Sequence, residues 1–133
     1  MWTVAALLTF GALALVPAQA QAVTFFQSPS GNIGCAISKT GARCDIAQKS
    51  WKPSPKPRSC PVDWGNGLSV GRRGKGRFTC AGDTVLRMGR KLAYGKTVRA
   101  GRFRCVSRRS QMRCVNSRNG HGFGLSRQRA RRF

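Results

Sequence analysis

Six cysteines in a chain of 133 residues constrain the fold more than any other feature of the sequence. A chain of this size buries proportionally little apolar surface, and disulfides are a common means of stabilising such chains where oxidation is permitted. Eight residues separate Cys35 from Cys44, and eight separate Cys105 from Cys114. Sequence alone leaves other connectivities open, but this spacing favours pairing between nearest neighbours. The favoured disulfides are Cys35–Cys44, Cys60–Cys80 and Cys105–Cys114.

The two evenly spaced pairs lie in segments that look like copies of one hairpin, residues 34–45 and 104–115. Cysteines directly opposite each other in an antiparallel ladder are close enough to bond. No stretch after Ala22 repeats its apolar residues with the helical period of 3.6. We therefore expect an all-β fold: a small, loop-rich, disulfide-stapled antiparallel sheet or sandwich with two similar Cys-bonded hairpins.

Other strands are expected where apolar and polar residues alternate between turn residues. Residues 48–76 are expected to be mostly loop, because three prolines between Trp51 and Pro57 prevent a continuous ladder. The further strand candidates are residues 78–86, 92–98, 101–106 and 120–125.

The chain begins with an almost unbroken apolar run, Trp2 to Val16, followed by Pro17 and overlapping Ala-x-Ala patterns. This arrangement is typical of a cleaved secretory signal peptide, here residues 1–22 with cleavage after Ala20 or Ala22. The competing interpretation, a retained membrane anchor, needs about 20 apolar residues in succession. We expect a secreted or cell-envelope protein with no transmembrane anchor after processing, a β domain over 23–127 and a basic tail over 128–133.

The charge balance excludes several functions. Against 25 Lys and Arg there are 3 carboxylates, Asp45, Asp63 and Asp83, which gives a formal net charge of +22. Paired-glutamate hydrolysis and a carboxylate-rich calcium site are therefore excluded. A zinc site is not expected, because the sequence has no Cys-x-x-Cys pair and a single histidine. We expect no metal and no cofactor.

Basic residues are concentrated after residue 71, where 19 of the 25 lie beside one acidic side chain. In the second hairpin, alternation places Phe103 and Cys105 on one face and Arg102 and Arg104 on the other, which Arg113 joins from the facing strand. The resulting surface predicts a cationic binding module for anionic polymers: cell-envelope polymers, nucleic acid or anionic lipid. The residues expected to bind are Arg72, Arg73, Lys75, Arg77, Arg102, Arg104, Arg113, Arg129, Arg131 and Arg132.

The high positive charge has two alternative interpretations. The first is compositional, since 18 Arg against 7 Lys with much Ala and Gly is the usage of a GC-rich genome. The second is a cationic antimicrobial effector, although no amphipathic helix is predicted. Sequence-specific recognition of nucleic acid is not expected, because no helix-turn-helix, zinc-finger or RNA-binding signature is present. The sequence does not set an oligomeric state.

His121, between two glycines, is a weak catalytic candidate. With one of the three aspartates it would form a base and its orienting group for phosphodiester hydrolysis, which makes a secreted phosphodiesterase another alternative. The simpler interpretation is a histidine bonded to local backbone, with each aspartate held by a structural arginine. We do not expect an enzyme. Similarly, Trp51, Trp64 and Tyr94 would stack on sugars or bases if exposed, but such side chains more often belong to the core.

A succession of short motifs resembles a known family. They include FQSPSGNIGC at 26–35, RCDI at 43–46, DWG at 63–65, CAGDT at 80–84 and, further on, YG at 94–95, FRC at 103–105, CVN at 114–116 and GHGF at 120–123. Together they resemble small exported proteins widespread in actinobacteria and classed as a domain of unknown function. The resemblance implies an exported, Cys-bonded domain from a GC-rich bacterium, and no activity or catalytic residue. This chain departs from the family in its basicity.

Overall fold

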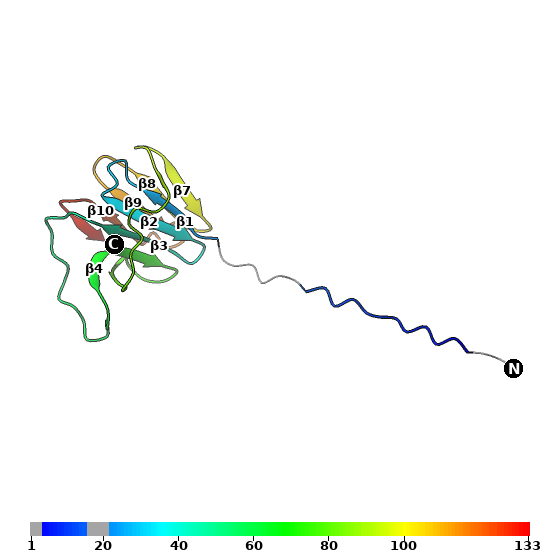
Figure 1. Cartoon of the computed structure of the whole chain (residues 1–133). Helices are drawn as coiled ribbons and strands as arrows, with labels where there is room; N and C mark the ends of the chain where they lie inside the picture. The colour runs from blue at the N-terminus through cyan, green and yellow to red at the C-terminus, as the bar shows by residue number, and fades with distance from the viewer. Residues whose placement is uncertain (1–3, 16–21) are drawn as a thin grey trace.

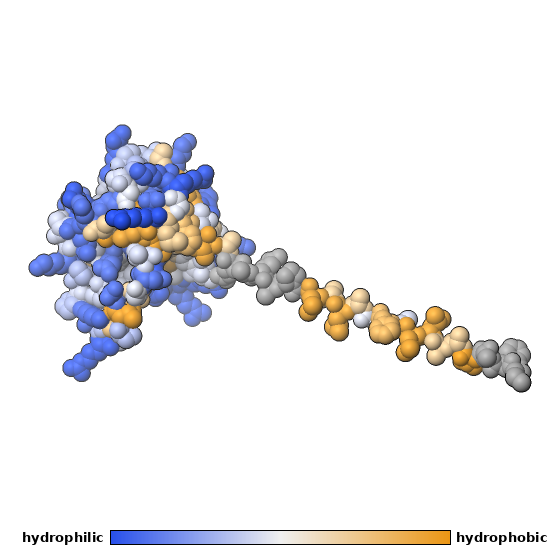
Figure 2. All heavy atoms as spheres, in the orientation of Figure 1, coloured by the Kyte–Doolittle hydropathy of each residue, from blue (hydrophilic) through white to orange (hydrophobic). Residues whose placement is uncertain are grey.

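The computed structural model describes residues 4–15 and 22–133. Residues 4–15 form no helix or strand and expose large apolar side chains such as Leu8 and Phe10, which colour this segment orange in Figure 2. The described part of the chain has no helix long and apolar enough to cross a membrane. Of the two expected cleavage points, the one after Ala20 lies outside the described residues, and the one after Ala22 lies directly ahead of the first strand region.

Eleven strands form two sheets (Figure 1). The described residues contain no helix. Sheet A has the order β5-β4-β3-β2-β1-β6, and sheet B has the order β11-β10-β9-β8-β7. The strands are β1 (Thr24–Gln27), β2 (Ile33–Ser38), β3 (Gly41–Ile46), β4 (Trp64–Gly71), β5 (Arg77–Cys80), β6 (Arg90–Lys91), β7 (Thr97–Ala100), β8 (Phe103–Ser107), β9 (Met112–Asn116), β10 (Gly122–Leu125) and β11 (Ala130–Arg132).

The sheets are antiparallel except where β6 pairs in parallel with β1. Strands β2, β3 and β4 contact strands β7 to β10 of the other sheet, so the two sheets pack face to face. Between them lies one core that includes the fully buried Phe26, Phe103 and Phe123. The predicted disulfide-stapled all-β fold is confirmed, and of the two forms left open it is the sandwich.

The three favoured disulfides are all present. Cys35 faces Cys44 in the β2–β3 ladder and Cys105 faces Cys114 in the β8–β9 ladder, each pair with Cα atoms 4.1 Å apart. All four side chains are fully buried, and the Sγ atoms of Cys44 and Cys114 lie 3.7 Å apart. The twin disulfides therefore contact each other at the centre of the sandwich.

The segment between β5 and β7 covers the outer face of sheet A. It passes so close to β2 that a Cβ at Gly34 would lie 2.7 Å from the Cα of Leu86, which excludes any larger residue without movement of the backbone. Two bonds to Gln27 hold it: the Gln27 side chain donates to the carbonyl of Gly89 (2.7 Å), and the N–H of Leu92 donates to the carbonyl of Gln27 (2.8 Å).

Several local expectations need correction. The expected strand 78–86 ends at Cys80, and in the expected strand 92–98 only the last two residues belong to a strand, β7. Residues 64–71, expected to be loop, form the longest strand, β4. Residues 130–132 of the expected basic tail pair with β10 as edge strand β11.

The three large aromatic candidates differ. Trp51 and Trp64 pack against the core, each with its ring centroid 6.0 Å from that of Phe78. Their Nε1–H groups donate to backbone carbonyls of Ser126 (2.9 Å) and Ser54 (2.8 Å), respectively. The core interpretation is confirmed for both tryptophans. Tyr94 is instead 43% exposed and lies under the guanidinium of Arg109.

Candidate anion-binding groove

Four hairpin turns meet at one end of the sandwich, because the strands of both sheets run in antiparallel pairs. They are the β2–β3, β4–β5, β7–β8 and β9–β10 turns. Each carries at least one cation, and the cationic side chains of all four line a groove of about 430 Å³. We call this the turn groove; its residues are Lys39, Arg72, Gly101, Arg102, Ser117 and Arg118.

The β9–β10 turn holds its neighbours in place. The fully buried Asn116 donates from Nδ2 to the carbonyls of Gly71 (3.2 Å) and Arg72 (3.3 Å), which ties sheet B to the β4–β5 turn. The hydroxyl and the N–H of Ser117 both donate to the carbonyl of Arg102 at 2.8 Å. Two of the arginines therefore project from backbone that buried or local hydrogen bonds keep in position.

The charges in the turn groove repel one another. Desolvation and the nearby positive charges of Arg118 and Arg72 lower the pKa of Arg102 below its ordinary value. Within the described chain, no carboxylate lines the groove or forms an ion pair with these cations. Converging guanidinium groups without a countercharge form a site that phosphate, sulfate or carboxylate groups can occupy with charge-assisted hydrogen bonds.

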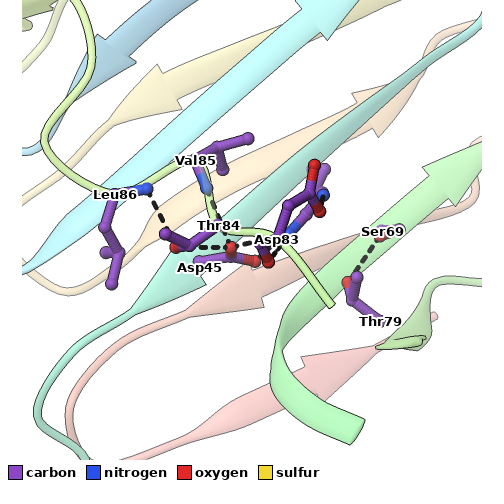
Figure 3. A network of polar contacts seen from close by, with 8 residues as sticks. Asp45, Ser69, Thr79, Asp83, Thr84, Val85 and Leu86 are labelled. Carbon is purple, nitrogen blue, oxygen red and sulfur yellow. Dashed lines mark hydrogen bonds and ion pairs between the residues drawn. The ribbon is translucent and has the colours of Figure 1, made fainter. Parts of the chain in front are cut away.

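Two of the three carboxylates are engaged on sheet A. The buried Asp45 accepts bonds from Arg43 (2.9 Å), the Thr84 hydroxyl (3.0 Å) and the N–H of Val85 (3.1 Å). The exposed Asp83 accepts from the same arginine at 2.9 Å, and Figure 3 shows Asp83 and Thr84 beside Asp45. Burial acts to lower the pKa of Arg43, but the hydrogen bonds and charges of Asp45 and Asp83 outweigh it and raise the pKa.

The expected arginine partner is thus confirmed for Asp45 and Asp83, which share Arg43. Asp63 forms no ion pair with any other described residue. Its backbone carbonyl accepts the N–H of Ala81 (3.0 Å), next to the Cys60–Cys80 disulfide.

The structure does not join His121 to a carboxylate. His121 lies in the β9–β10 turn of sheet B, where its N–H donates to Oδ1 of Asn119 (3.0 Å) and its carbonyl accepts from Asn116 (2.8 Å). Among the described residues no hydrogen bond or ion pair links its imidazole to an aspartate, and no group of three metal-ligating side chains comes together. The arrangement needed for a base and its orienting carboxylate is not assembled.

The ten residues expected to bind anions are divided among three places. Arg72 and Arg102 line the turn groove, while Arg73 and Lys75 are exposed in the β4–β5 turn beside it. The β8–β9–β10–β11 register places Arg104, Arg113 and Arg131 on the outer face of sheet B, together with Arg99, which lies opposite Arg104. The remaining three lie apart: Arg77 on β5, Arg129 in the β10–β11 turn, and Arg132 with its guanidinium 4.7 Å from the ring centroid of Phe78.

Two groove residues, Lys39 and Arg118, were not expected. Lys39 occupies the turn of the first predicted hairpin, and Arg118 lies in the Ser-Arg-Asn-Gly sequence of a turn. Turn composition could have marked both as tip residues. Lys39 and Arg118 lie close together only because the two sheets pack against each other, and no local sequence pattern predicts that packing.

Comparison with known proteins gives one match. No curated protein and no solved structure matches the chain. A family described as a family of unknown function (DUF6636) matches residues 6–133, which include every strand of the sandwich and all six cysteines. The expected resemblance to a domain of unknown function is confirmed at that level, and the chain belongs to the DUF6636 family.

Proposed function

We propose that this protein is an exported binding module that holds anionic polymers through the turn groove. The observation that carries the proposal is the convergence of Lys39, Arg72, Arg102 and Arg118 from four separate turns on one groove. Each phosphate, sulfate or carboxylate group bound there relieves repulsion between cations and releases counterions from the polymer. A polymer with regularly spaced charges gains this contribution repeatedly.

The outer face of sheet B supports the same proposal. Arg99 and Arg104 occupy directly opposite positions on β7 and β8, where like charges destabilise a sheet. Arg113 and Arg131 flank Gly124 in the neighbouring row of the same face. A chain of anionic groups that leaves the turn groove along sheet B would meet these four cations, so the site accommodates a polymer better than a single small anion.

Export is part of the proposal because of the disulfides and the N-terminal sequence. Three disulfides without a free cysteine in the described residues are typical of proteins in oxidising compartments. The apolar run before Pro17 and the Ala-x-Ala patterns after it are typical of a secretory signal. A cell-envelope or extracellular polymer is therefore the expected ligand.

The test compares affinity for heparin, double-stranded DNA and teichoic acid over a series of salt concentrations. For DNA, the plot of log K against log salt is expected to lose about 0.9 units of slope for each contacting cation removed, or about 1.8 in an Arg102→Gln/Arg118→Gln chain. The matched control, Lys52→Gln/Lys56→Gln, removes the same charge from the proline-rich loop and is expected to change the slope little. Equal effects of the two double variants, or an affinity indifferent to salt, would contradict the proposal.

A further inference from the structure

A second hollow, a cleft of about 650 Å³, opens at the end of the sandwich away from the turn groove. There the β1–β2 turn, residues 86–94, the β8–β9 turn and residues 125–128 surround an apolar floor. The floor includes Ile33, Met112 and Leu125, which belong to the core. Its volume lies within the range of about 300 to 1,000 Å³ that is usual for small-molecule sites.

The walls of the cleft carry positive charge and no countercharge. Of its five cations, Arg127 donates to Oε1 of Gln48 (2.8 Å), and the guanidinium of Arg109 lies 4.9 Å from the ring centroid of Tyr94. The other three are Arg87, Lys91 and Arg108, which form no side-chain hydrogen bond or ion pair within the described part of the chain. Among the described residues, no carboxylate lines the cleft.

One buried polar group in the cleft lacks a partner. Ser107 is 1% exposed. Among the buried side-chain oxygen and nitrogen atoms of the described residues, its Oγ is the one that forms no hydrogen bond. Both backbone groups of Ser107 form hydrogen bonds. Its N–H donates to the carbonyl of Lys96 (3.0 Å), and its carbonyl accepts from the N–H of Gly95 (2.7 Å). Burying a hydroxyl without a partner is costly, so the Ser107 hydroxyl is a candidate to pair with a bound ligand.

The rim of the cleft also holds a strained backbone. Arg87 has φ of 62° and is, in the described chain, the one residue other than glycine with positive φ. Such conformations concentrate at ligand sites, where surrounding structure enforces them. Here the bonds from Gln27 to Gly89 and Leu92 fix the segment that follows, and so keep Arg87 at the rim.

We propose that the cleft binds an anionic sugar, one that carries a carboxylate or a phosphate. The free cations of the rim would hold the acidic group. The Ser107 hydroxyl and the carboxamide of Gln128, which forms no side-chain hydrogen bond with described residues, would pair with the sugar hydroxyls. The inference does not depend on the turn groove, because the two sites share no residue.

The test is a titration of the isotope-labelled, oxidised full chain followed by backbone amide NMR. The probes are glucuronate and glucose 6-phosphate, compared with glucose and inorganic phosphate. We expect at least one acidic sugar to shift the amides of residues 107–111 and 125–128 and to bind about tenfold more tightly than either comparison probe. Binding of only the carboxylated or only the phosphorylated probe identifies the acidic group.

Two variants separate binding from folding. Ser107→Ala removes a hydroxyl without a protein partner, so we expect an unchanged or higher Tm together with about 3- to 10-fold weaker sugar binding. Arg108→Gln should weaken binding about tenfold, whereas Arg99→Gln, an equal change of charge on the outer face of sheet B, should leave it unchanged.

Three results would each overturn the inference: acidic sugars that bind no better than phosphate, shifts centred on residues 72, 102 and 118, or full affinity in the Ser107→Ala chain. Affinity for double-stranded DNA, measured on the same samples, reports on the turn groove separately, because DNA carries no free acidic sugar for the cleft. The cleft and the groove can therefore fail independently of each other.

Discussion

The two disulfide hairpins have matching inner faces and contrasting outer faces. Cys44 and Cys114 point into the core at equivalent places, and an arginine precedes each of them. After Cys44 comes Asp45, which binds Arg43, whereas after Cys114 comes Val115. The guanidinium of Arg113 lies instead 4.9 Å from the ring centroid of Phe133.

This contrast separates what the fold requires from what the surface does. The inner faces of the two hairpins meet at the contact between the two buried disulfides, so the same packing holds both. The outer face of sheet A pairs its charge and is covered by the segment after β5, while sheet B presents arginines without carboxylates in the described structure. In Figure 2, hydrophilic side chains project around the outline of the domain, and an apolar band crosses its visible face. Under the proposed function, sheet B is the half suited to anionic partners.

The largest expected effect is on the shared inner face. Replacing Cys35 and Cys44 together by alanine, or Cys105 and Cys114, should lower the free energy of unfolding by about 2 to 5 kcal/mol, measured by urea denaturation. The two losses should be similar, because each disulfide closes a loop of the same sequence separation, 9, and fills the same core. If one pair were dispensable, the hairpins would not be equivalent.

The Cys60–Cys80 disulfide provides the control for this comparison. It spans a sequence separation of 20 and lies outside the central core cluster. Its removal should lower the free energy of unfolding by about 3 kcal/mol, because the unfolded chain gains entropy, with little loss of core packing.

The next effect concerns the covered outer face. Asp45→Ala should cost about 2 to 4 kcal/mol, because it leaves Arg43 and the N–H of Val85 without their buried acceptor. Arg113→Gln, at the equivalent position to Arg43, should change stability by less than about 1 kcal/mol. A matching loss for both variants in urea denaturation would show that sheet B also relies on an ion network.

Converting sheet B toward sheet A should weaken binding. Val115→Asp places a carboxylate beside Arg113 and opposite Arg104, as Asp45 lies beside Arg43. The salt slope of heparin binding should fall by about 1, since one or two cations become neutralised. Val115→Asn controls for the loss of the apolar side chain. Equal slopes for the Asp and Asn chains would show that the outer face of sheet B takes no part in binding.

The smallest effect is a pH dependence confined to sheet A. The hydrogen bond and charge of Arg43 lower the pKa of Asp83 from its ordinary 3.8. Its stabilising contribution is therefore complete above the unfolded pKa and is lost as the pH falls through the lower folded value. Asp83→Asn should flatten the fall of Tm as the pH decreases below the ordinary pKa of 3.8. An unchanged profile would show that the pair contributes nothing.

Cysteine spacing predicted the two hairpins and their disulfides, and strand alternation predicted the face on which Arg104 and Arg113 lie. Strand β4 was missed because Gly65, Gly67 and Gly71 interrupt its apolar alternation. The reason for one of them is tertiary: a Cβ on Gly67 would overlap the neighbouring Cys44 carbonyl and lie 2.7 Å from Oδ1 of Asp45. Similarly, the turn groove and the cleft each combine side chains from several turns, whose proximity only the packed sandwich creates.

The most direct test of the central claim is to map backbone amide shifts on the oxidised chain while a short double-stranded DNA, a polymer of phosphates without free acidic sugars, is added. Our account predicts that the largest shifts occur at the turns carrying Lys39, Arg72, Arg102 and Arg118, continue over the outer face of sheet B, and spare residues 49–58 and the surroundings of Asp45. Shifts spread evenly over basic residues of both sheets, or centred on residues 49–58, would contradict it.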